Sequence, residues 1–348
     1  IAAAGDVVSD GAVTITSGSG TTTSGDITTT SDAIQFASAT TLGGAVALAS
    51  ANGAVTFAST LNGAQNLTIT AGTGAVTFTG AVGGSTRLGT LNIVSAGNVG
   101  AAALTLGAFD QDAGSGTTTF GGAVNTNTSA GVVVANTNLA VNAAVTTTSS
   151  GVVTFTQSGT TVIAAAGDVV SDGAVTITSG SGTTTSGDIT TTSDAIQFAS
   201  ATTLGGAVAL ASANGAVTFA STLDGTTSDA EDLTITPGTG LVTFTGTASG
   251  ITSLETLSIV RPVTVVSSNV NQVLVSQTIS QFQVFGDISG PRNNRELDKL
   301  FSLDATTAPF ILTGVFATNS VFELSPEIFS GSNNTNDSQE NTDERSKR

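Results

Sequence analysis

The chain has 348 residues, a formal net charge of −17 and only 9% charged residues, and it contains no Cys, His, Met, Trp or Tyr. This composition excludes disulfide bonds, thiolate or histidine catalysis and Cys/His metal centres. The acidic balance argues against a nucleic-acid partner, because phosphates would be repelled. No apolar run approaches the ~20 residues that a membrane-spanning helix needs.

The main sequence signal is a long internal repeat. Residues 1–61 recur unchanged as residues 163–223, which is an offset of 162. After that point the match resumes with substitutions at residue 233, and four residues are inserted in the second copy within the polar stretch 224–232. Insertions are tolerated in solvated turns, so we expect a loop there. A repeat of this kind predicts a modular, elongated fold.

Short strands are predicted along the whole repeat. Pairs of apolar residues separated by one residue recur, and this alternation is typical of strands with one buried face. Gly, Ser, Asn and Asp, which favour turns, stand between the pairs. The series is Val55/Phe57, Leu67/Ile69, Val76/Phe78, Leu91/Ile93 and Leu104/Leu106, in which Val55 to Val76 spans 21 residues and Leu67 to Leu91 spans 24.

Two all-β architectures fit this spacing. One is a parallel β-solenoid, or β-helix, in which coils of about 20–25 residues stack on each other. The other is a series of tandem β-sandwich domains. The period and the small core residues favour the solenoid. Residues 1–260 would then give about 11–12 coils and a rod roughly 55 Å long at ~4.8 Å per coil.

The sequence divides into four segments. Residues 1–162 form the first solenoid unit, residues 163–260 a partial second unit, residues 261–330 a β-rich cap or small module, and residues 331–348 a disordered tail. The composition changes near residue 261, since seven of the 16 Phe residues lie after residue 280. A cap would cover the open strand edge of the last coil, and a docking site for a partner is the alternative.

Two further expectations concern the ends of the chain. One short helix is predicted over residues 294–301, where Leu297, Leu300 and Phe301 share a face. The chain begins in the middle of the repeat pattern at Ile1, and we expect it to be part of a longer protein.

Carboxylates are the only side chains left for site chemistry. The clearest spacing is Asp6 with Asp10, which recurs as Asp168 with Asp172. The simpler interpretation is a pair of turn residues that cap the corners of a coil. A weak Ca²⁺ site is the sharper one, because carboxylates and turn carbonyls suit a hard cation. No catalytic residues are predicted, and Arg87 is the one basic residue among residues 1–260.

Two segments carry a family resemblance. Residues 74–93 (Gly-Ala-Val-Thr-Phe-Thr-Gly and onward) and residues 116–128 (Gly-Thr-Thr-Thr-Phe-Gly-Gly and onward) resemble the repeats of bacterial filamentous-haemagglutinin-like and autotransporter-adhesin-like proteins. The resemblance covers about residues 1–260. It implies a right-handed parallel β-solenoid, export through an outer membrane, and a role in adhesion, biofilm or surface coating.

The expected function is therefore a non-catalytic structural or adhesive segment of a large bacterial protein, extracellular or on the cell surface and associated with the outer membrane. Its partner would be an unidentified surface, glycan or protein ligand. A Ca²⁺-stabilised extracellular module is the alternative. A carbohydrate-active β-helix enzyme is disfavoured, because it would need acidic and basic side chains side by side.

Overall fold

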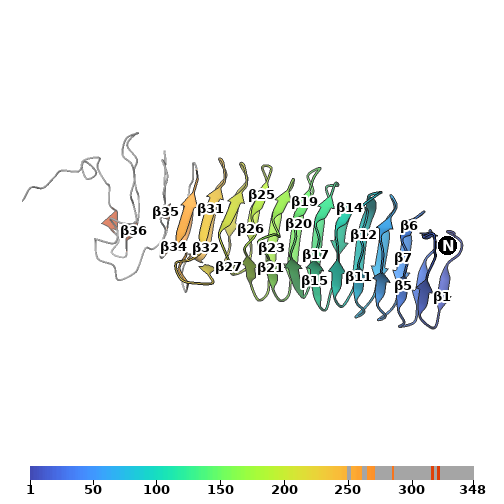
Figure 1. Cartoon of the computed structure of the whole chain (residues 1–348). Coiled ribbons are helices and arrows are strands. Elements are labelled where there is room, and N and C mark those ends of the chain that lie inside the picture. Colours follow the sequence, from blue (N-terminus) through green and yellow to red (C-terminus); the bar gives the residue numbers. More distant parts are fainter. Residues whose placement is uncertain (249–251, 261–264, 271–283, 286–314, 317–319, 322–348) are drawn as a thin grey trace, which may run out of the picture.

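The chain folds as an all-β solenoid of about twelve coils. The computed structural model describes residues 1–248, 252–260, 265–270, 284–285, 315–316 and 320–321. Every element within these ranges is a β-strand, and the strands stack side by side along one rod (Figure 1). The solenoid is the architecture favoured by the spacing, and residues 1–248 and 252–260 form it in place of the alternative sandwiches.

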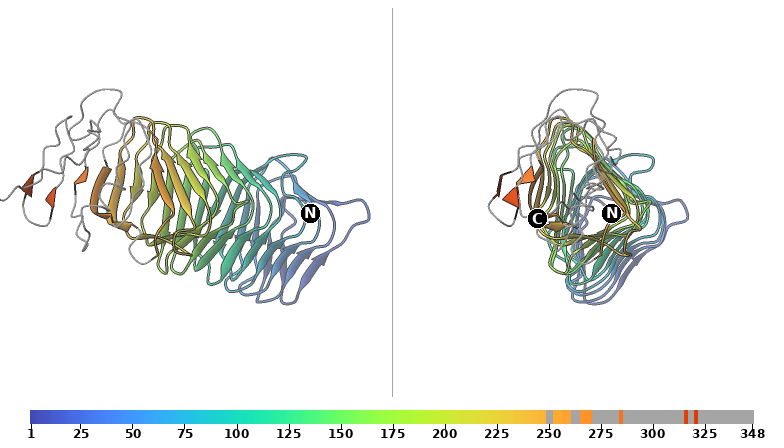
Figure 2. Two further views of the ribbon diagram at one scale, coloured as in Figure 1. Left: turned by 60° about the vertical axis from the view of Figure 1, so that its left-hand side comes forward. Right: turned by 90° about the vertical axis from the view of Figure 1, so that its left-hand side faces the viewer.

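Each coil has three faces, and each face contributes one parallel ladder that runs along the rod. The end view in Figure 2 shows the coils superposed around a three-sided outline. We call the faces first, second and third in the order in which the chain meets them, and the connections between them corners.

The first face carries β1 (Val7–Ser9), β4 (Ile27–Thr29), β7 (Val46–Ala49), β10 (Leu67–Thr70), β12 (Leu88–Ser95), β14 (Leu104–Gln111), β17 (Val132–Asn136), β20 (Val153–Gln157), β23 (Val175–Ser179), β26 (Ile196–Phe198), β29 (Val217–Phe219), β32 (Val242–Ala248), β34 (Val265–Val270) and β35 (Val284–Phe285). The second face carries β2 (Val13–Ile15), β5 (Ile34–Phe36), β8 (Val55–Phe57), β11 (Val76–Phe78), β13 (Val99–Ala101), β15 (Thr117–Phe120), β18 (Asn138–Val141), β21 (Thr161–Ile163), β24 (Thr183–Thr185), β27 (Thr202–Leu204) and β30 (Leu223–Gly225).

The third face carries β3 (Thr21–Thr23), β6 (Thr40–Leu42), β9 (Leu61–Asn62), a bridge at Val82, the start of β14, and then β16 (Val124–Thr126), β19 (Val145–Thr147), β22 (Val169–Ser171), β25 (Ile189–Thr191), β28 (Val208–Ala211), β31 (Asp232–Thr236) and β33 (Thr256–Ile259). Strand β14 therefore turns from the third face to the first without a break. One antiparallel pair, β36 (Val315–Phe316) with β37 (Ser320–Val321), lies outside these ladders.

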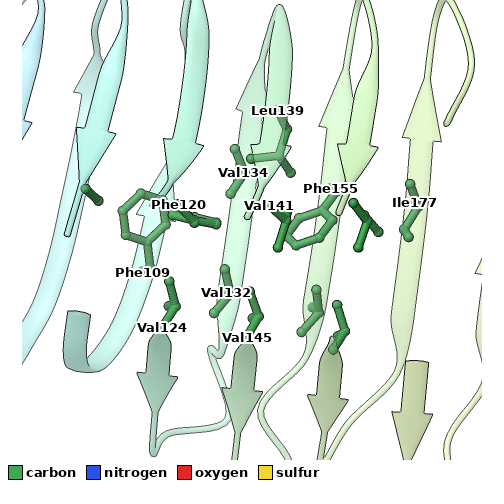
Figure 3. Close-up of a cluster of buried hydrophobic side chains, with 14 of the residues drawn as sticks. Phe109, Phe120, Val124, Val132, Val134, Leu139, Val141, Val145, Phe155 and Ile177 are labelled. Atoms are coloured by element: carbon green, nitrogen blue, oxygen red, sulfur yellow. The ribbon is translucent and has the colours of Figure 1, made fainter. Parts of the chain in front are cut away.

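The core is a narrow column of apolar side chains inside the coils. Alternation places Val55 and Phe57 inside and Thr56 outside, and most strands repeat this pattern. All nine Phe residues of the first 260 are buried, several of them as stacked rings such as Phe36 on Phe57 at 4.7 Å. Figure 3 shows Phe155 and Ile177 with neighbouring apolar side chains between the strands of successive coils. Stacking like on like lets small residues fill a thin core at protein density.

The strand ladders continue without interruption across the boundary between the two sequence units. Residues 162 and 163 both lie within β21, which pairs with β18 before it and β24 after it. The predicted insertion loop is confirmed, because residues 226–231 connect β30 to β31. Buried Glu231 closes that loop by accepting hydrogen bonds from the Thr226 hydroxyl and, at 3.1 Å, from the Thr227 N–H.

The C-terminal predictions fall mostly outside the described residues. Of the predicted cap at 261–330, only β34 to β37 are described, and β34 and β35 extend the first-face ladder. The predicted helix at 294–301 and the predicted tail at 331–348 lie outside the described residues.

Candidate functional site

The predicted acidic residues lie at the corners of the solenoid. The Asp6 carboxylate accepts a hydrogen bond from the Asp26 N–H of the next coil at 3.0 Å. Asp26 in turn accepts one from the Ala47 N–H of the following coil at 2.7 Å. The corner is a place where the backbone ladder is interrupted, so each carboxylate satisfies an amide that would otherwise lack a partner. These contacts act as staples between successive coils.

The second copy repeats the same staples. Asp168 accepts a hydrogen bond from the Asp188 N–H at 2.9 Å, and Asp188 accepts one from the Ala209 N–H at 2.8 Å. Asn side chains serve in the same way at other corners. For example, the Asn52 amide oxygen accepts a hydrogen bond from the Thr73 N–H at 3.1 Å.

Asp10 and Asp172 occupy a different kind of corner. The Asp10 carboxylate accepts a hydrogen bond from the Thr30 hydroxyl at 2.8 Å. Asp172 accepts one from the Thr192 hydroxyl at 3.0 Å and another from the Ser150 N–H of the preceding coil at 2.8 Å. The bond from Ser150, followed by that from Thr192, lowers the pKa of Asp172 below the usual value for an aspartate, because both stabilise the ionised form.

The structure does not bring together the two members of either predicted pair. Asp6 precedes β1 and Asp10 follows it, so they lie at opposite ends of the strand, roughly 13 Å apart along the backbone. Asp168 and Asp172 are separated by β22 in the same way. Among the residues that the structure describes, no group of three or more His, Cys, Asp or Glu side chains is arranged to hold a metal ion. A Ca²⁺ role for these four residues therefore stays a prediction.

A second acidic pair sits on the first face. Burial, and to a lesser extent repulsion from Asp112, raises the pKa of Asp110. Arg87 does not pair with a carboxylate there, because its guanidinium donates hydrogen bonds to the carbonyl oxygens of Leu106 at 2.6 Å and Asn125 at 3.1 Å. Arg87 thus ties three successive coils together.

The outward surfaces are rows of small polar side chains. In each copy, middle residues of successive strands stand in register and point outward, and most of them are Thr. On the second face this row is Thr14, Gln35, Thr56 and Thr77. Because the nine Phe side chains of residues 1–260 are buried, the outward rows of this part of the chain offer hydroxyl and amide groups but no aromatic ring on which a sugar or base could stack.

A buried polar column was not predicted. Gln157 lies inside the solenoid, where it accepts a hydrogen bond from the Thr161 hydroxyl at 2.7 Å and donates one to the Val134 carbonyl at 3.0 Å. Asn136 is its register partner in the preceding coil. The strand alternation could have revealed both, because Val153, Phe155 and Gln157 occupy equivalent inward positions of β20. Sequence reasoning missed these two inward positions because it assumed that amide side chains point toward solvent.

The comparisons with known proteins identify no relative. No family model, curated protein or solved structure matches the chain. A search of the described residues for a helix long and apolar enough to cross a bilayer also finds none.

Proposed function

We propose that residues 1–260 form a rigid, non-catalytic rod that serves as a structural or adhesive segment of a bacterial protein, secreted or on the cell surface. The observation that carries this proposal is that polar side chains form hydrogen bonds between successive coils. The corner Asp and Asn side chains, and Arg87, hold one coil to the next. These corner side chains and Arg87 are thus engaged in holding the rod together.

The uniform surface supports the same role. Outward rows of Thr repeat from coil to coil, and adding coils lengthens such a rod without redesign of the core. The resemblance of residues 74–93 and 116–128 to adhesin repeats supports a place outside the cell. The partner we expect is a surface, glycan or protein ligand.

Rod length can be changed without creating a new junction. Deleting residues 62–223 joins Leu61 to Asp224, and because residues 1–61 repeat residues 163–223, the shortened rod contains only contacts present in the intact one. Placing residues 62–348 after Leu223 lengthens the rod by the same amount. At ~4.8 Å per coil, each change is about 37 Å. The two variants carry one and three copies of the repeated segment.

The experiment compares these three lengths on the cells that produce the protein. Antibody labelling of intact cells tests exposure, and retention of the cells on a host or abiotic surface under flow tests adhesion. Rod length and the number of copies change together in these variants, so either role, spacer or adhesive segment, predicts retention that changes in order from the short rod to the long one. No labelling of intact cells, together with equal retention of a strain that lacks the protein, would overturn the proposal.

A further inference from the structure

The first coil of the rod, formed by β1, β2 and β3, has one open edge. Each of these strands pairs with a single neighbour, which is β4, β5 or β6 of the next coil. The strands of the same sequence in the second copy, β22, β23 and β24, each pair on both sides. Among the described residues, the first coil therefore lacks a neighbour that its copy has.

Burial differs between the copies where that neighbour is missing. Val13 and Ile15 are partly exposed, whereas the identical Val175 and Ile177 are buried. From residue 23 to residue 61 the inward side chains are buried in both copies. Because the two sequences are the same, the open edge is what leaves the inward side chains of the first coil exposed.

The second copy shows which segment covers this edge. Its first coil is covered by residues 145–162, through β19, β20 and β21. Val153 and Phe155 are the register partners of Val175 and Ile177, and Figure 3 shows Phe155 with Ile177 in the core. The Val153 N–H donates a 2.9 Å hydrogen bond to the Ala174 carbonyl. An apolar contact and a backbone bond thus join the same two strands.

Polar side chains inside this junction make the fit more selective. The hydroxyl oxygens of Ser179 and Thr161 lie 2.7 Å apart, and those of Ser171 and Thr147 lie 3.1 Å apart. All four are buried, whereas the two identical serines of the first coil are partly exposed. Burying a hydroxyl without a partner is costly, so the open edge favours a cover that supplies threonine hydroxyls at these places.

The path of the backbone fits the same cover. In the second copy the covering coil leads into Ile163, whose carbonyl accepts a 2.8 Å hydrogen bond from the Ser186 N–H. The Ile1 carbonyl accepts the equivalent bond from the Ser24 N–H, also at 2.8 Å. Ile1 therefore already lies where the covering coil ends, and residues 145–162 placed before it would need no new turn.

We propose that the open edge of the first coil is a docking surface for residues 145–162 of a further copy of the repeated unit, joined in series as the two copies of this chain are. A second intact chain does not offer this coil, because its own β22, β23 and β24 already cover it. Main-chain hydrogen bonds supply the affinity of such strand addition, and the inward side chains supply its specificity. The inference concerns how units join, so it goes beyond the structural or adhesive role and does not depend on it.

The first test extends the full chain by adding residues 145–162 directly before Ile1. This recreates the sequence of the natural junction at residues 162 and 163, and the tether gives the added coil a high effective concentration. Hydrogen exchange is followed at the Val13 amide, which bonds to the Ala33 carbonyl of the second coil. Its protection should rise about tenfold or more, toward that of Val175, because the first coil becomes an internal one.

A matched control carries the same addition with Val153→Asp and Phe155→Asp in the added coil only. Docking would then bury two carboxylates against Val13 and Ile15 without partners, so protection at Val13 should stay at the level of the 348-residue chain. Unchanged protection in the first extended chain, or an equal rise in the control, would overturn the inference. Neither measurement involves cells, so the outcome is separate from that of the adhesion experiment.

The second test measures binding with a fluorescently labelled peptide of residues 145–162 as the probe. Fluorescence anisotropy should show saturable one-to-one binding to the 348-residue chain and none to the extended chain, whose edge is already covered. Absence of saturable binding, or binding that the extended chain retains, would overturn the inference. Sedimentation of both chains tests the other occupant. Self-association of the 348-residue chain that the extended chain lacks would assign the edge to a second copy of the chain and overturn the inference.

Discussion

Ile15 and Ile177 provide a matched test of burial, because 61 residues around them are identical. Ile177 is fully buried and has Phe155 and Phe198 as register partners in the coils on either side. In the 348-residue chain, Ile15 is only partly buried, since its one register partner is Phe36 in the second coil. We compare the substitutions Ile15→Ala and Ile177→Ala.

The expected magnitudes follow from these neighbours. Truncating a fully buried Ile to Ala costs about 2–5 kcal/mol, through lost transfer free energy and the cavity that remains. Ile177→Ala should fall in this range. Ile15→Ala should cost roughly half of that or less, because only one side of the side chain is packed and water can enter the space. The local sequence cannot cause the difference, so position in the stack must.

Amide hydrogen exchange is the suitable measurement, since solenoids open locally and a single global unfolding free energy is not defined. The reporters are the matched amides of Val13 and Val175, which each donate a 2.9 Å hydrogen bond to the next coil. Protection at Val175 should fall about tenfold for every 1.4 kcal/mol lost. Equal losses at both amides would refute the reasoning, because identical environments would then surround the two isoleucines. The milder pair Ile15→Val and Ile177→Val serves as the control and should preserve the order with smaller effects.

Further predictions concern charge, backbone and metal. The pKa of Asp172 is lowered in the folded chain, so its carboxylate stabilises the fold fully above the pKa of the unfolded chain. This stabilisation is lost as the pH falls through the folded pKa. Asp172→Asn should therefore flatten the decline of the urea midpoint in acid. The pKa of Asp110 is raised, so its ionised carboxylate destabilises the fold near neutral pH. Asp110→Asn should raise the urea midpoint at pH 7 and change it little in acid. An unchanged midpoint at pH 7 would contradict this interpretation. Gly72 has a φ of +61° and its added Cβ would lie 1.8 Å from the Ala51 carbonyl oxygen, so Gly72→Ala should lower the melting temperature clearly, whereas Gly11→Ala, which meets nothing within 4 Å, should leave it nearly unchanged. For the Ca²⁺ alternative, melting in Ca²⁺ and in chelator should give equal midpoints if the corner carboxylates serve only as staples, and a higher midpoint in Ca²⁺ would favour the metal site.

Much of the fold could be predicted because it depends on local alternation. Val55, Phe57 and their equivalents mark each strand through a period of two, and turn residues mark each corner. The polar insertion after Leu223 was predicted as a loop for the same reason. Strand and turn positions depend on which side chains are buried and which stay in solvent, and that pattern can be read directly from the sequence.

The second copy is turned by one face relative to the first, because β1 lies on the first face and β22, which has the same sequence, lies on the third. This turn could not be predicted, because it depends on the total number of faces between the copies. That number is hidden where one continuous strand passes a corner with Gly107 as its only turn-favouring residue, as β14 does from Leu104 to Gln111. It is also hidden where a face is reduced to a single bridge at Val82. Sequence also left open whether Asp6 and Asp10 lie together or cap separate corners, since a four-residue spacing can close around an ion or span a strand.

The staples have a consequence for how the chain can fold during synthesis. In the Asp6, Asp168 and Asn52 staples the earlier coil supplies a side-chain oxygen, and the later coil supplies only a backbone N–H. A newly made coil therefore meets acceptors that are already in place, and any residue except proline can engage them. These three staples are in this sense directional, from the N-terminal end toward the C-terminal end, whereas the Asp172 carboxylate of a later coil accepts from the Ser150 N–H of an earlier one.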